Sequence, residues 1–139
     1  MSEGVRAVVI GHLGMPEGMV EAVRHITGVE PDALTAVSNR GMSPDALAEA
    51  VRTIVGDGPA ILFTDLPSGS CGFAARRLTS GNDALVVISS VNLPMLIDFA
   101  MQRALPMHEL VPRLLAKGRT AITVAPAHLD NHEHRAAAG

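Results

Sequence analysis

The sequence predicts an α/β fold in which helices cover both faces of an open, doubly wound, mostly parallel sheet. Short β-branched runs that look apolar on both faces alternate along the chain with segments whose apolar residues recur at helical spacing. The length of 139 residues, 47% of them hydrophobic, suffices for one compact domain. We therefore expect a domain over residues 1–126 and a flexible tail over residues 127–139, which are polar and then alanine-rich.

Five apolar runs are predicted to form the strands of this sheet. The first is β-branched and ends at Gly11, and the most regular of the others, Ala-Ile-Leu-Phe, runs out into Thr64 and Asp65. The predicted strands cover residues 5–10, 34–37, 60–63, 83–89 and 119–124.

The segments between these strands have the apolar spacing of helices. Gly28 is a stop signal for the first helix, and Ser43 followed by Pro44 is a typical start for the second. Pro112 falls inside the last helix, where we expect it to kink the helix or to move its start to a later residue. The predicted helices cover residues 15–26, 44–55, 73–78, 95–103 and 107–117.

The composition disfavours several classes of function. Eleven Lys and Arg against 14 Asp and Glu give a net charge of −3, which provides no basic stripe for nucleic acid. The apolar runs are far shorter than the ~20 residues that cross a bilayer, and the first four residues lack a signal-peptide pattern, so we expect a cytoplasmic protein. Because only 2% of the residues are aromatic and one is cysteine, the six histidines are the conspicuous chemical resource.

Polar side chains follow three of the predicted strands, where the crevice of an open parallel sheet lies. They are His12, Asp65 and Asn92. A neutral imidazole is a good nucleophile, and Asp65 could accept a hydrogen bond from one ring nitrogen so that the other presents its lone pair. An ordinary loop histidine and a capping aspartate are the more frequent interpretation of this spacing alone.

The small residues 68–72 open a predicted helix, so backbone N–H groups and hydroxyls can approach an anion there. The candidate phosphate-binding residues are Gly69, Ser70 and Cys71. Together with His12 and Asp65 they predict a histidine that accepts phosphate. Cys71 could instead be a nucleophile, but no second histidine is placed to act as its base.

Three histidines near the end of the chain, His128, His132 and His134, resemble a small metal cluster. A solvated tail is the better interpretation so close to a chain end, so we expect no metal site and no cofactor. The glycine after the first strand does not begin a dinucleotide-binding motif, and residues 68–72 lack the order of a hydrolase nucleophile elbow.

A series of motifs runs through nearly the whole chain, from about Arg6 to Val124. The motifs are Val-Val-Ile-Gly-His at 8–12, Glu-Gly at 17–18, Phe-Thr-Asp at 63–65, Gly-Ser at 69–70, Ala-Ala at 74–75 and Val-Asn-Leu-Pro-Met-Leu at 91–96. This series resembles the IIA component of the mannose family of the bacterial phosphoenolpyruvate-dependent sugar phosphotransferase system. The segment 91–96, combined with the spacing of the histidine and the aspartate, is its most specific part.

The resemblance implies a cytoplasmic phosphotransferase, with residues 1–126 as a IIA domain. His12 would take a phosphoryl group from the phosphohistidine carrier protein and pass it to a IIB component for sugar uptake. Asp65 would orient His12, and Ser70 would contact the phosphate. The family commonly dimerises by exchanging a C-terminal edge strand, here residues 119–124, and meets the membrane only through the transporter components, which recognise the sugar.

The chain departs from the family pattern beside the histidine and in the loop at 68–71, where the family often has Gly-Gly-Ser-Pro and this chain has Ser-Gly-Ser-Cys. The family usually has Thr or Ser before the histidine and Gly after it, whereas this chain has Gly11 and Leu13. Two alternatives stay open: a regulatory phosphohistidine protein without its own transporter, and the phosphoryl-donor subunit of a dihydroxyacetone kinase, which has a similar fold. The segment 91–96 favours the mannose family. An enzyme with its own small-molecule pocket is a distant third.

Overall fold

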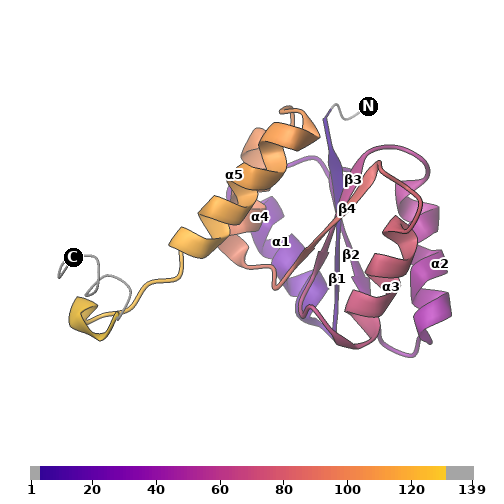
Figure 1. Ribbon diagram of the computed structural model, residues 1–139, viewed down its shortest axis with the longest axis horizontal. Helices are drawn as coiled ribbons and strands as arrows, with labels where there is room; N and C mark the ends of the chain where they lie inside the picture. The colour runs from indigo at the N-terminus through magenta and orange to yellow at the C-terminus, as the bar shows by residue number, and fades with distance from the viewer. Residues whose placement is uncertain (1–3, 131–139) are drawn as a thin grey trace.

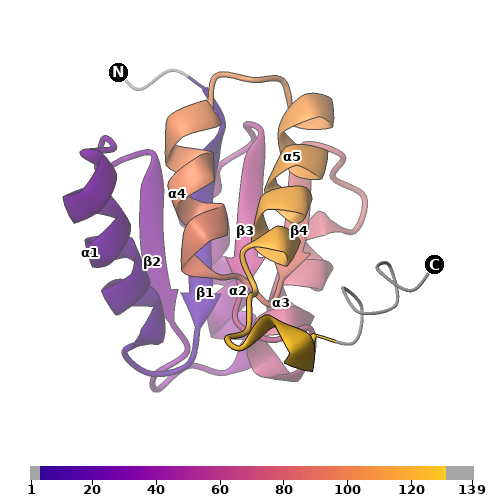
Figure 2. The same cartoon turned by 90° about the vertical axis from the view of Figure 1, so that its left-hand side faces the viewer.

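The computed structural model describes residues 4–130. Within them, four parallel strands form one sheet in the order β2-β1-β3-β4. The strands are β1 (Arg6–Gly11), β2 (Leu34–Ser38), β3 (Ala60–Thr64) and β4 (Leu85–Ser89). Their arrowheads lie at one end of the sheet in Figure 2. The predicted open parallel sheet is therefore confirmed, with β1 and β3 at its centre.

Five α-helices and a 3-10 helix complete the described part of the chain. They are α1 (Met15–Thr27), α2 (Pro44–Val55), α3 (Gly69–Thr79), α4 (Leu93–Gln102), α5 (Met107–Thr120) and the 3-10 helix η1 (Ala127–Leu129). Helices α1, α4 and α5 cover one face of the sheet, and α2 and α3 cover the other (Figure 1). Helices on both faces are thus confirmed, and none of the described helices is long and apolar enough to cross a membrane.

The alternation of side chains along the central strands produces two hydrophobic cores. Val9 and Phe63 point into the core under α1, α4 and α5, where Phe63 meets Phe99 edge-on with ring centroids 5.7 Å apart. Val8 and Leu62 point into the core under α2 and α3. Because both faces are covered, every residue of β3 is buried, which explains its uninterrupted apolar sequence.

The strand predicted at residues 119–124 does not form within the described part of the single chain. Arg119 and Thr120 belong to the last turn of α5, because the buried series Leu110, Leu114 and Gly118 keeps the helix packed to its end. Residues 122–124 follow without pairing to the sheet, and Figure 1 shows the chain leading away from it towards η1. In the described residues, no strand pairs with the outer edge of β4.

Helix α5 begins at its predicted first residue, whereas helix α3 begins earlier than predicted. Pro112 does not move the start of α5, which begins at Met107. Pro112 is exposed, so the helix carbonyl that loses its N–H partner can turn to water. Helix α3 begins at Gly69, four residues before the predicted start, because Ser68 is extended and its neighbours turn at once into the helix. Helix η1 occupies the first residues of the predicted tail, and 131–139 lie outside the described residues.

Candidate functional site

The structure brings His12 and Asp65 together, as the sequence predicts. Because β1 and β3 are neighbours, the residues that follow them lie at the same edge of the sheet. The Nδ1 atom of His12 lies 2.6 Å from Oδ2 of Asp65, and the backbone N–H of His12 donates to the same oxygen over 3.0 Å. The carboxylate therefore fixes both the ring and the backbone of the histidine.

Asp65 is held on both of its oxygens, since Oδ1 accepts the backbone N–H of Leu66 over 2.9 Å. Burial acts to raise the pKa of Asp65, but the hydrogen bonds from His12 and Leu66 lower that pKa below its usual range. The carboxylate is thus ionised at neutral pH and can only accept hydrogen bonds. In the neutral imidazole, the proton is then on Nδ1, which donates to Asp65, and Nε2 has the lone pair.

The histidine is more open than its partner. Its side chain is 45% exposed, against 15% for Asp65. His12 is followed by Leu13, whose φ of 52° lies in the left-handed region that residues other than glycine seldom adopt. A hydrogen bond from the backbone N–H of Leu13 to Oδ1 of Asn39, 3.2 Å long, holds this turn.

Sequence reasoning missed the role of Asn39. Asn39 follows β2, the other neighbour of β1, and its backbone N–H donates to the carbonyl of Gly11 over 2.9 Å. Its Nδ2 lies 3.5 Å from Oγ of Ser70, so one side chain connects the His12 turn to the start of α3. Its place at the end of a predicted strand is the signal that could have found it.

The departure at Gly11 has a local physical reason. A Cβ atom at this position would lie 2.6 Å from Cε of Met15 and 3.3 Å from Oδ2 of Asp65. A side chain would therefore push against the first turn of α1 and crowd the carboxylate that holds His12. The absence of a side chain at position 11 suits the close approach of Asp65.

The predicted phosphate-binding residues Gly69, Ser70 and Cys71 form the first turn of α3. Ser70 joins the site through Asn39, and Sγ of Cys71 lies 4.0 Å from Nδ1 of His12. Burial and the charge of Asp65 raise the pKa of Cys71, and a hydrogen bond with Ser70 opposes this only in part. The thiol is thus neutral at pH 7, which does not suit a nucleophile.

His12, Asp65 and Cys71 are the only group of three His, Cys, Asp or Glu side chains in residues 4–130 that is arranged to hold a metal ion. The ligand atoms of His12, Asp65 and Cys71 all lie within 4.8 Å of one another. Of the three C-terminal histidines, His128 is exposed in η1, while His132 and His134 lie outside the described residues.

Asn92, which follows the fourth strand, does not join this site. Its Oδ1 accepts the backbone N–H of Met95 over 3.1 Å and so caps α4, while its Nδ2 donates to the carbonyl of Gly118 over 2.9 Å. The most specific motif of the resemblance, residues 91–96, therefore fastens the start of α4 to the end of α5.

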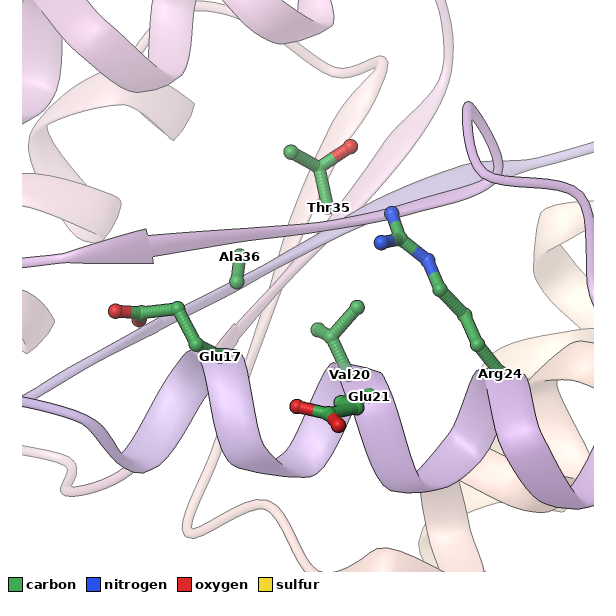
Figure 3. Close-up of a pocket in the computed structure, with 6 residues that line it drawn as sticks. All are labelled: Glu17, Val20, Glu21, Arg24, Thr35 and Ala36. Atoms are coloured by element: carbon green, nitrogen blue, oxygen red, sulfur yellow. The ribbon is translucent and has the colours of Figure 1, made fainter.

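A cavity of about 430 Å³ between α1 and β2 is separate from the site. Figure 3 shows Glu17 and Arg24 at its two ends. The guanidinium of Arg24 donates to the backbone carbonyls of Pro31 and Leu34 over 2.9 and 2.6 Å, so this cation fastens the entry to β2.

Among the solved structures with the same fold are IIA proteins of the phosphotransferase system (PTS). An EIIA component from Streptococcus agalactiae superposes with a TM-score of 0.80 and 21% identity, over 86% of this chain and 96% of that one. The mannose/sorbose-specific IIA subunit from Enterococcus faecalis gives a TM-score of 0.77 and 20% identity, over 88% and 95% of the two chains. At this identity the likeness shows the fold. No curated protein matches the sequence.

The family itself follows from the sequence match. The model of the mannose-type EIIA family, described as the PTS system fructose IIA component, matches residues 6–114. This range is more than half of the chain and includes His12, Asp65 and the first turn of α3. The chain therefore belongs to the mannose-type IIA family of the sugar phosphotransferase system.

Proposed function

We propose that the protein is a phosphocarrier in sugar uptake, in which His12 accepts a phosphoryl group from the phosphohistidine carrier protein and passes it to a IIB component. The observation that carries this proposal is the hydrogen bond of 2.6 Å between Nδ1 of His12 and Asp65, on a ring that is half exposed. It leaves Nε2 as the nitrogen with a free lone pair, on a side chain that a partner protein can reach.

In the proposed reaction, the Nε2 lone pair of His12 attacks the phosphorus of the donor's phosphohistidine in line. A new N–P bond forms as the donor's N–P bond breaks, and the donor imidazole leaves with the electron pair. The ring of His12 gains positive character, which the Asp65 carboxylate stabilises through Nδ1–H. Transfer to the IIB component repeats the exchange with His12 as the donor, so positioning and charge stabilisation supply most of the catalysis.

The first turn of α3 is the proposed binding site for the phosphate. A phosphoryl group adds close to two negative charges, and the N–H groups at a helix N-terminus favour an anion. Gly69, Ser70 and Cys71 provide this turn, and Ser70 adds a hydroxyl. The Asn39 link connects this turn to the loop that carries His12, so the histidine and the anion site share one support.

We also propose that the protein is cytoplasmic and acts as a homodimer through the chain that follows α5. Ile122 and Val124, two residues apart, are 77% and 42% exposed, so two large apolar side chains lie in solvent close together in the sequence. The outer edge of β4 has no strand partner among the described residues. Pairing of residues 119–124 with β4 of a second copy would cover both features, provided that the last turn of α5 unwinds.

Incubation with phosphoenolpyruvate, enzyme I and the phosphohistidine carrier protein tests the proposal. We expect one acid-labile phosphate per chain on the native protein and none on His12→Ala. His25→Ala is the matched control, because His25 is an exposed histidine on α1 away from the site and should not alter labelling. Equal labelling of His12→Ala, or no acid-labile phosphate on the native protein, would overturn the proposal.

A further inference from the structure

The phosphoryl-transfer proposal gives no role to the thiol side chain of Cys71. This side chain is fully buried, yet its sulfur lies 4.0 Å from Nδ1 of His12, on the side of the ring where Asp65 lies. Three donor atoms of different chemistry, a ring nitrogen, a carboxylate oxygen and a sulfur, thus meet within 4.8 Å. The ring nitrogen belongs to a half-exposed side chain, so the cluster lies at the edge of the fold.

These separations are close to those of a tetrahedral zinc site. With Zn–N, Zn–O and Zn–S bonds of about 2.0–2.3 Å, neighbouring ligand atoms lie about 3.5 Å apart. The sulfur-to-nitrogen distance of 4.0 Å exceeds this slightly, and the nitrogen-to-oxygen distance of 2.6 Å is shorter. For both distances to reach this value, Nδ1 of the exposed imidazole would have to move away from Asp65 and towards Cys71.

We infer that His12, Asp65 and Cys71 form a Zn²⁺ site, in which the ion occupies Nδ1 and makes the histidine unable to accept phosphate. A thiolate, an imidazole and a carboxylate suit zinc, whereas magnesium and calcium prefer oxygen ligands alone. Three protein ligands leave a fourth position for water, as in zinc sites that are reached from solvent.

Loading the site moves protons in a defined way. Cys71 binds as a thiolate and releases its proton to solvent, while Asp65 exchanges its hydrogen bond for a bond to the ion. Nδ1 of His12 gives up its proton to coordinate Zn²⁺, and a proton is taken up at Nε2, so the imidazole stays neutral. One proton per ion is released overall.

The consequence for phosphate acceptance rests on the proposed function. With the proton at Nε2, this nitrogen has no lone pair in the plane of the ring and cannot attack a phosphorus atom. Zn²⁺ binding and phosphorylation of His12 are then mutually exclusive. Zn²⁺ therefore inhibits phosphoryl transfer by competing with the phosphorylated carrier protein for His12.

Metal binding is measured without any phosphoryl donor. A failure of the proposed Zn²⁺ site can then be told apart from a failure of the proposed phosphocarrier function. The parent is the full chain with His128, His132 and His134 changed to Gln, which removes the tail as a second ligand set. Zn²⁺ affinity is measured by competition with a chromogenic chelator, and Co²⁺ serves as the spectroscopic probe. We expect one Zn²⁺ per chain and a thiolate-to-cobalt charge-transfer band in the near ultraviolet.

Cys71→Ser and His12→Gln test the ligands. Each should weaken Zn²⁺ binding by more than about 10-fold, since even loss of a ligand's outer hydrogen-bond partner costs that much, and Cys71→Ser should abolish the cobalt band. His12 is exposed, so His12→Gln should fold normally even if the buried Cys71 substitution does not. His25→Gln is the matched control and should bind as the parent does.

Three results would overturn the inference: a parent that binds no Zn²⁺, a parent whose Co²⁺ complex lacks the thiolate band, or a His12→Gln variant that binds Zn²⁺ as tightly as the parent. If Zn²⁺ binds as expected but does not slow labelling of His12, the mutual exclusion is wrong. If Zn²⁺ binds and His12 never takes a phosphoryl group, the proposed function fails and the metal site stands.

Discussion

Two hydrogen-bonded pairs of a carboxylate and a basic side chain have nearly the same burial and different chemistry. In the first, Asp65 is 15% exposed and its partner His12 is 45% exposed; in the second, Asp98 of α4 is 8% exposed and its partner Arg113 of α5 is 48% exposed. Each joins a shielded carboxylate to a half-exposed basic side chain. The difference lies in what the basic side chain retains once the pair has formed.

Arg113 uses two nitrogens on Asp98, with Nε at 3.0 Å from Oδ2 and Nη2 at 3.3 Å from Oδ1. A guanidinium has no lone pair to offer and stays protonated, so this pair joins two helices and does nothing further. His12 uses one nitrogen on Asp65 and keeps the other for chemistry. A buried carboxylate therefore indicates a reactive site only when its partner has an unused nucleophilic atom.

The largest effect on activity should come from Asp65→Asn. An amide cannot stabilise the positive imidazole and can favour the wrong tautomer, as happens when the orienting aspartate of a hydrolase triad is replaced. We expect the rate of phosphoryl transfer to fall by roughly 10²–10⁴-fold. Rapid-quench labelling from the phosphorylated carrier protein measures this rate, and an unchanged rate would remove the role given to Asp65.

Asp98→Asn should produce the opposite result. Removal of the charge leaves the half-exposed Arg113 with a weaker partner, so we expect the free energy of unfolding to fall by about 1–3 kcal/mol. The transfer rate should stay within about twofold of the native rate. Urea denaturation measures the stability, and the same labelling assay measures the transfer rate. A loss of transfer in a folded Asp98→Asn protein would show that the Asp98–Arg113 pair also takes part in the reaction.

Asn39→Ala should have an intermediate effect on transfer. It removes the hydrogen bond to Leu13 and the contact with Ser70. Each of these contributes about 0.5–1.5 kcal/mol to the stability of the loop conformation. We expect transfer to slow by about 3- to 10-fold while His12 is still labelled completely. Full native speed would show that the link between the two loops has no part in transfer.

The smallest expected effect is on the pH dependence of stability. Although burial acts to raise it, the pKa of Asp65 is lowered by its hydrogen bonds with His12 and Leu66. The ionised carboxylate therefore stabilises the fold at neutral pH, and this contribution is lost as the pH falls through the lowered pKa. The free energies of unfolding of native protein and Asp65→Asn should converge in acid. A gap that widens on acidification would contradict this assignment.

Local pattern predicted most of the fold and the meeting of His12 with Asp65. The central residues of β1 and β3 are apolar because both faces of the sheet are buried, and the positions of His12 and Asp65 follow directly from the ends of those strands. Asn39 was missed because its role depends on β2 lying beside β1, and strand order is set by packing between distant segments.

The segment 119–124 shows the limit of a local pattern. Ile122 and Val124 favour a strand, but a strand needs a partner, and in this chain α5 stays helical as far as Thr120 through packing of Leu114 and Gly118. In the sequence, Cys71 was likewise only one of several small residues at 68–72, and nothing there predicted where its thiol would lie. Only the fold shows that its sulfur faces the ring of His12.

The central claim is that Asp65 reserves Nε2 of His12 for the phosphoryl group. Phosphorus and nitrogen NMR of the phosphorylated protein, with ¹⁵N-labelled histidine, tests this claim directly. We predict a single phosphohistidine at His12 with phosphorus bonded to Nε2 and a proton retained on Nδ1. Phosphorus bonded to Nδ1, or to any other residue, would contradict the account.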